Sequence, residues 1–147
     1  MIYLFDTDTL IFMIRGSKTS NRNQTNRERA QTLVKRCRES QLAGHTLAVS
    51  AISVAELEFG ARLAENVDRE LQAIHKILSP FELLDFDAVN APARYGNIRH
   101  ELESIGQPIG AMDLLIAAHS VSIQATLVTN NTAHFSRITG LSIENWS

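Results

Sequence analysis

The chain has 147 residues, a formal net charge of −2, 44% hydrophobic residues and a single cysteine. This is the length of one domain, and a lone cysteine excludes an intrachain disulfide and the disulfide-rich secreted class. Asp6 and Asp8 interrupt the first apolar run, which argues against a secretory signal, and no run approaches the roughly 18 apolar residues of a membrane span. We therefore expect residues 1–147 to form a single domain in a cytoplasmic protein with no membrane contact.

Short apolar runs alternate with amphipathic segments along the chain. Strands are predicted at residues 2–6, 46–50, 81–86 and 126–129, with a fifth at 141–145. Helices are predicted at residues 26–42, 53–65, 67–81, 110–123 and from Asp87, as the cap, to about Ser104. This alternation predicts an α/β fold whose mainly parallel sheet is covered by helices on both faces.

Positive charge is concentrated between residues 15 and 38. This stretch holds 8 of the 14 lysines and arginines, and Glu28 is its one acid. Such asymmetry is typical of a surface that contacts phosphates, but a solvated helix face has the same composition. Charge alone does not separate the two interpretations.

Several polar side chains lie where ligands bind in a parallel sheet. Asp6 ends the first predicted strand, and Asn130 and Asn131 follow the fourth. The carboxyl ends of parallel strands meet at one edge, so we expect these residues to lie together. Glu56 lies in the first turn of its predicted helix, and Asp113 lies on the apolar face of another. A buried carboxylate is normally paired or bound to a metal, and no Lys or Arg lies within ten residues of Asp113.

Simpler explanations exist for most of these acids. Ser53 and Glu56 form the S-x-x-E pattern of a capping box, and Asp8 is expected to cap the helix that follows it. Asp113 would complement a helix N-terminus. Asp6 has the weakest alternative, because Asp is disfavoured in strands.

Other chemistries lack their motifs. The stretch FDTDTL is similar to the D-x-D-x-[TV] motif of haloacid-dehalogenase-type phosphotransferases, but Leu10 stands where that motif ends and the late paired acids are missing. A phosphatase of that type is therefore disfavoured. The chain has no dinucleotide-binding or P-loop glycine motif, and its five histidines have no zinc-binding spacing.

Four segments together resemble the PIN-domain ribonucleases, specifically the VapC toxins of bacterial toxin–antitoxin pairs. They are YLFDTDTLI (3–11), SAISVAELEFGA (50–61), YGNIRHELESIGQPIGAMDLLIAAHS (95–120) and LVTNNTAHFSRITGLSIENW (127–146). The likeness covers nearly the whole chain, with the segments in the family's order. It implies a PIN-like three-layer α/β/α fold with a sheet of four to five strands.

The resemblance also implies a site. It places the family's conserved acids at Asp6, Glu56 and Asp113, and its fourth polar position at Asn131 or the neighbouring Asn130. The implied cofactor is Mg²⁺ or Mn²⁺, held directly by Asp6 and Asp113. Glu56 would bind it through water or orient the nucleophile, and Asn131 would position water or a phosphate.

The implied function is that of a metal-dependent endoribonuclease toxin acting on structured RNA such as tRNA. The implied partners are a cognate VapB-type antitoxin that blocks the site and a second copy of the chain in a homodimer. In this setting Arg22, Arg27 and Arg29 are expected to contact the RNA backbone. The alternative is a non-catalytic RNA-binding or regulatory module on the same fold, which the amide at the fourth position allows. Converging acids argue against that alternative because they repel phosphate. The family's first motif usually reads D-T-N, so Asp8 adds a carboxylate here.

Overall fold

A computed structural model describes residues 1–18 and 23–147. Within these ranges the strands are β1 (Ile2–Phe5), β2 (Thr46–Ser50), β3 (Glu82–Leu84), β4 (Thr126–Val128) and β5 (Ser142–Glu144). The helices are α1 (Thr7–Gly16), α2 (Gln24–Leu42), α3 (Ala51–Arg62), α4 (Val67–Leu78), α5 (Asn90–Ser104), α6 (Ala111–Ser122) and α7 (Thr132–Phe135). None of the helices in the described ranges is long and apolar enough to cross a membrane.

The five strands form one sheet in the order β3-β2-β1-β4-β5, and every neighbouring pair is parallel. The predicted α/β fold is confirmed, and the sheet is wholly rather than mainly parallel. β1 lies at the centre of the sheet, between β2 and β4. The carboxyl end of β1 is therefore flanked by the carboxyl ends of two other strands.

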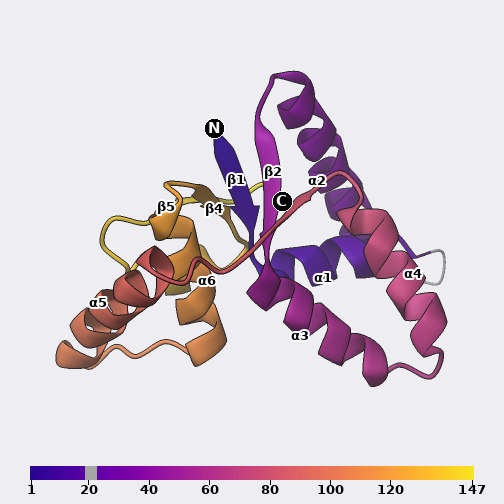
Figure 1. Ribbon diagram of the computed structural model, residues 1–147. Helices are drawn as coiled ribbons and strands as arrows, with labels where there is room; N and C mark the ends of the chain where they lie inside the picture. Colours follow the sequence, from indigo (N-terminus) through magenta and orange to yellow (C-terminus); the bar gives the residue numbers. More distant parts are fainter. Residues whose placement is uncertain (19–22) are drawn as a thin grey trace.

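Successive strand residues point to opposite faces of the sheet and supply two separate cores. Phe5, Val49 and Val128 pack with α1, α2, α3 and α4 on one face. Leu4 and Leu127 pack with α5 and α6 on the other. Figure 1 shows these two groups of helices on either side of the sheet. Burial on both faces explains why the three central strands, β2, β1 and β4, are largely continuous apolar runs rather than alternating ones.

α1 and α2 pack closely at a glycine. A Cβ atom built on Gly16 would lie 2.2 Å from the Cβ of Ala30, which is closer than side chains can approach. The two small residues thus let the end of α1 lie against α2. This contact fixes the basic helix α2 beside the helix that begins at Asp6.

Several predicted helices have different ends in the structure. α3 spans Ala51–Arg62 rather than 53–65. α4 ends at Leu78 rather than residue 81, because Pro80 has no N–H to continue the helical hydrogen bonds. α5 begins at Asn90, and its N-cap is Val89 rather than the predicted Asp87. Asp87 lies two residues before this cap, and its Oδ2 accepts a hydrogen bond from the Asn90 N–H at 2.8 Å. Pro92 lies in the first turn of α5, where its missing N–H is tolerated.

Candidate active site

Asp6 lies at the carboxyl end of β1 and is the N-cap of α1. Its Oδ1 accepts a hydrogen bond from the Thr9 N–H at 2.9 Å, and its Oδ2 accepts one from the Thr129 hydroxyl at 2.6 Å. The prediction that Asp8 caps this helix is wrong, since Asp8 lies one residue inside its first turn. Asp6 is only 2% exposed, and this burial raises the pKa of its carboxyl group despite the two hydrogen bonds. Both donors are neutral, so neither of these partners supplies a cation to compensate the charge of the ionised carboxylate.

Glu56 is linked to the Asp6 segment through Thr7. The Thr7 hydroxyl lies 2.7 Å from Glu56 Oε1 and 2.9 Å from Ser53 Oγ. A carboxylate only accepts hydrogen bonds and a hydroxyl has one proton, so Thr7 donates to Glu56 and accepts from Ser53. This network holds one carboxylate oxygen of Glu56 beside the start of α1.

The capping-box explanation for Ser53 and Glu56 is wrong. The N-cap of α3 is Ser50, whose Oγ accepts from the Ile52 N–H at 3.1 Å, and Ser53 lies inside the helix. Two serines one helical turn apart both fit the local pattern of a cap. The contact of Ser53 with Thr7, 46 residues away, decides between them.

The loop after β4 is tied to Asp6 through Thr129. The Thr129 hydroxyl donates to Asp6 and accepts from the Asn131 N–H at 2.9 Å. The Asn131 side chain itself is exposed. The neighbouring Asn130 is half-buried, and its Oδ1 accepts a hydrogen bond from the Ser147 hydroxyl at 2.6 Å. Both candidates for the fourth polar position therefore lie at the predicted edge of the sheet.

Asp113 lies in the first turn of α6 and is half-buried. α6 leads back to the amino end of β4, so its N-terminus lies at the carboxyl edge of the sheet with the other acids. Asp113 Oδ2 is 3.2 Å from His134 Nε2. Burial raises the pKa of Asp113, and His134 partly offsets that rise. The sequence did not reveal His134, because the short helix α7 that presents it has no periodic signal.

Negative charge converges at this edge. Asp8 is exposed, and its charge raises the pKa of both Asp6 and Asp113. Asp8 thus lies within electrostatic reach of both acids. Each oxygen of Asp6 accepts one hydrogen bond and keeps a further lone pair for another partner.

These oxygens fit a hard divalent cation. Residues 1–18 and 23–147 contain no group of three or more His, Cys, Asp and Glu side chains arranged to hold an ion. Mg²⁺ keeps several waters and is often bound by one or two carboxylates, so it does not need such a group. The donor set of Asp6 and Asp113 therefore fits Mg²⁺ or Mn²⁺ and not a zinc site of thiolates and imidazoles.

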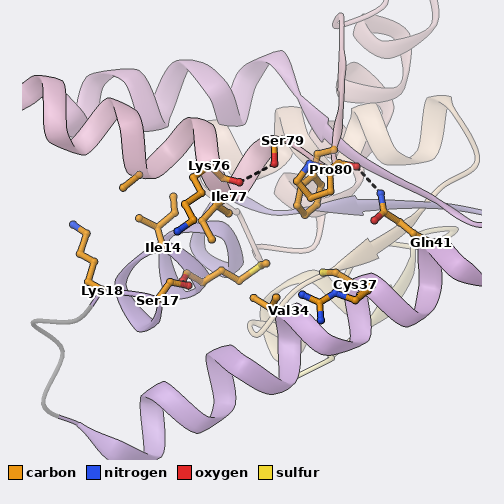
Figure 2. A pocket seen from close by; sticks show the side chains of 14 residues that line it. Ile14, Ser17, Lys18, Val34, Cys37, Gln41, Lys76, Ile77, Ser79 and Pro80 are labelled. Atoms are coloured by element: carbon orange, nitrogen blue, oxygen red, sulfur yellow. Dashed lines mark hydrogen bonds between the residues drawn. The ribbon is translucent and has the colours of Figure 1, made fainter.

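A cavity lined largely by apolar side chains lies away from these acids. It has a volume of about 650 Å³ and is formed by residues of α1, α2, α4 and the segment that follows α4. Figure 2 shows Ile14, Val34, Cys37 and Ile77 converging on it. Burial raises the pKa of the Cys37 thiol to about 12, so this cysteine is a packing residue and not a nucleophile.

The fold and the four polar segments define a PIN domain, and a family model described as "PIN domain" matches residues 3–141. Ribonuclease VapC2 of Rickettsia felis is 36% identical over 146 residues, covering 99% of this chain and 98% of the relative. The tRNA(fMet)-specific endonuclease VapC of Shigella flexneri is 32% identical over 99% of this chain and 98% of its own length.

Solved structures agree with these relatives. VapBC2 from Rickettsia felis, crystallised with a promoter DNA fragment, superimposes with a TM-score of 0.81 at 34% identity, over 100% of both chains. DNA-bound VapBC from Salmonella typhimurium has a TM-score of 0.84 at 31% identity, over 100% of this chain and 99% of the other. The chain belongs to the PIN-domain family and, within it, to the VapC ribonucleases, which are the toxins of toxin–antitoxin systems.

Proposed function

We propose that this ribonuclease is a metal-dependent endonuclease whose reaction centre is formed by Asp6, Glu56, Asp113 and Asn131. The observation that carries the proposal is the buried carboxylate of Asp6, which has neutral hydrogen-bond donors and acidic neighbours. Burying such a charge is costly unless a cation compensates it. Asp6 and Asp113 would hold Mg²⁺ or Mn²⁺ through their free oxygen lone pairs.

A bound Mg²⁺ would stabilise the charge that develops on the scissile phosphate and make water a better nucleophile. Glu56 has one oxygen held by Thr7, which leaves the other to accept a proton from the attacking water. The Asn131 amide, which is exposed, would donate a hydrogen bond to a phosphate oxygen. Thr7 and Thr129 orient the two carboxylates without touching the substrate.

The proposed substrate is structured RNA such as tRNA, cleaved in the cytoplasm. Two relatives at 32% and 34% identity are tRNA(fMet)-specific endonucleases. The basic segment supports a polyanionic substrate, because a groove of about 510 Å³ is lined by Lys18, Arg27, Lys35 and Arg38. Arg22, expected to contact RNA, lies outside the described residues.

The proposed partners are a VapB-type antitoxin and a second copy of the chain. The similar solved structures from Rickettsia felis and Salmonella typhimurium are toxin–antitoxin complexes. The 650 Å³ cavity suits an amphipathic segment, because its apolar wall carries Arg38 and Lys76 for acidic side chains. The exposed Phe59 of α3 and the adjoining Leu63 supply apolar surface for a homodimer.

Incubating the purified protein with tRNA distinguishes this function from the rival RNA-binding module. We expect cleavage with Mg²⁺, none with EDTA, and none for Asp113→Asn, whose amide has the same shape but is a poorer ligand. The control is Asp68→Asn, which neutralises an acid in the first turn of another helix. RNA that is bound but left intact by the wild-type protein with Mg²⁺ would establish the rival function.

A further inference from the structure

A smaller pocket, separate from the 650 Å³ cavity and the 510 Å³ groove, adjoins the acidic edge of the sheet. It has a volume of about 380 Å³, and its lining includes Asp8, Phe12, Arg15, Asn26 and Asn130. This volume lies near the lower end of the roughly 300–1,000 Å³ of ligand pockets, which suits one planar group better than a large one. The pocket lies along one side of α1, from Asp8 to Gly16, beside the start of α2 and the loop after β4.

The pocket has an aromatic wall. Phe12 is half-buried and packs against the core, so its ring is held in place. The guanidinium of Arg29 lies over this ring, 5.1 Å from its centroid. Aromatic rings and guanidinium planes are the surfaces on which unpaired bases stack, because every base has a π-face.

The rest of the lining offers polar groups for the edge of a base. Asn130 is held by its Oδ1, which accepts from Ser147, so its amide nitrogen is the group left to donate. The exposed carboxylate of Asp8 only accepts hydrogen bonds. Asn130 follows Thr129, whose hydroxyl binds Asp6, so the pocket opens next to the proposed reaction centre.

We propose that this pocket binds one unpaired nucleobase of the RNA, flanking the scissile phosphate, with the base stacked on Phe12 and its amino group donating to Asp8. The inference rests on the proposed RNA cleavage. It assigns base selectivity to Asp8, whose carboxylate lines the pocket. Adenine, guanine and cytosine carry an exocyclic amino group and uracil does not, so uracil is the disfavoured base at this position.

Stacking is tested with a series of short single-stranded RNAs that span a mapped cleavage site. Each RNA carries one abasic nucleotide, at a position that differs from one RNA to the next. Binding is measured with Ca²⁺ in place of Mg²⁺ to suppress cleavage. We expect Phe12→Leu to weaken binding of the intact RNA roughly tenfold, and Phe12→Tyr to restore it. At one abasic position next to the cut, Phe12→Leu has no further effect, because the base it would stack on is already absent.

Phe86→Leu is the matched control, since Phe86 is half-buried like Phe12 and does not line the pocket. Equal losses for Phe12→Leu at every abasic position would overturn the stacking assignment. So would a Phe12→Leu protein that binds RNA normally but no longer binds the antitoxin, because the pocket would then serve a protein partner.

Selectivity is tested by placing each of the four bases at the position that the abasic scan identifies. We expect the wild-type protein to cleave the uridine RNA roughly tenfold more slowly than the others, as for the loss of one base-edge contact. Asp8→Asn should reduce this ratio. A ratio between substrates cancels any effect of Asp8 on metal binding, so an unchanged ratio would overturn the role of Asp8. Failure of the wild-type protein to cleave any RNA would instead overturn the proposed function itself.

Discussion

Thr129 donates a 2.6 Å hydrogen bond to the carboxylate of Asp6, 123 residues away in the sequence. Both residues lie at the carboxyl ends of adjacent parallel strands, β4 and β1. The same hydroxyl accepts from the Asn131 N–H. Thr129 therefore orients one proposed metal ligand and anchors the loop that carries another polar residue of the site.

Thr129→Val should lower metal affinity and activity by about 10- to 100-fold, the usual effect of removing a group that orients a metal ligand. Valine fills the same space in this fully buried position but leaves Asp6 Oδ2 and the Asn131 N–H without their partner. Titration with Mn²⁺ followed by electron paramagnetic resonance measures the affinity directly. Thr129→Ser keeps the hydroxyl, so equal losses for Val and Ser would contradict this role.

Asp6→Asn should abolish cleavage yet raise the melting temperature of the metal-free protein at neutral pH. Burial raises the pKa of Asp6 in the folded state, so its contribution to stability is full below the ordinary carboxyl pKa of about 3.9 and is lost as pH rises through the folded pKa. Asn removes the charge and still caps α1. A gain of 1 kcal/mol corresponds to about 4 °C in a domain of this size.

Calorimetry at pH 4 and pH 7 checks this prediction. The gain for Asp6→Asn should be larger at pH 7 than at pH 4, because ionising the buried carboxyl group costs stability as the pH rises. Asp6→Ala is the contrasting variant, because it also loses the cap and should cost about 1 kcal/mol of stability. A lower melting temperature for Asp6→Asn at pH 7 would show that the carboxylate is compensated without a metal.

Glu56→Gln should lose activity by at least about 100-fold, the lower range for removing a general base, at an unchanged melting temperature. Glutamine keeps an oxygen to accept from Thr7 but cannot take a proton from water. Ser53→Ala removes a neighbour in the same network and leaves the Glu56 carboxylate intact, so its effect should be smaller. Single-turnover cleavage and thermal unfolding on the same preparations separate the two effects. Wild-type activity in Glu56→Gln would return Glu56 to a structural role.

Neutralising Arg27 and Arg38 together should weaken RNA binding and flatten its dependence on salt. Both line the basic groove beside α2, and each lost contact with single-stranded RNA changes the log–log slope by about 0.7. Arg36→Gln is the control, because Arg36 is already engaged by Glu144 and the Trp146 ring. Affinity is measured at several salt concentrations with Ca²⁺. An unchanged slope in the double variant would make the basic segment a solvated helix face.

Gly16→Ala should destabilise the fold by about 1–3 kcal/mol, as expected for overpacking. The new methyl group would meet Ala30 Cβ at 2.2 Å. Gly60→Ala is the matched control in helix α3, where nothing lies within 4 Å, and it should stabilise by up to about 1 kcal/mol. Urea unfolding of both variants measures the difference. Equal free energies of unfolding for the Gly16→Ala and Gly60→Ala variants would mean that α1 and α2 can move apart at little cost.

The sheet and the edge where the acids gather were predictable because both follow from local patterns. Apolar runs define the strands, and parallel strands bring their carboxyl ends together whatever the loops do. The partners of the acids were not predictable. Thr7 with Glu56, Thr129 with Asp6 and His134 with Asp113 are contacts between distant segments, which no short window of sequence contains.

The residues that cap helices α1 and α3 were likewise not predictable from the local sequence. Asp6 and Asp8 are equally good cap residues two positions apart, and so are Ser50 and Ser53 one turn apart. In each pair the residue nearer the strand is the cap. The choice depends on where β1 and β2 end, and that is set by pairing with neighbouring strands.

The strand order has a consequence for protein synthesis. β1 is made first and β4 more than a hundred residues later, yet the two are neighbours in the sheet. A growing chain that carries Asp6 and Glu56 still lacks Thr129 and Asn131, and so has no assembled reaction centre. If the proposed reaction centre is correct, we expect a nascent or truncated chain that ends before β4 to be inactive as a nuclease.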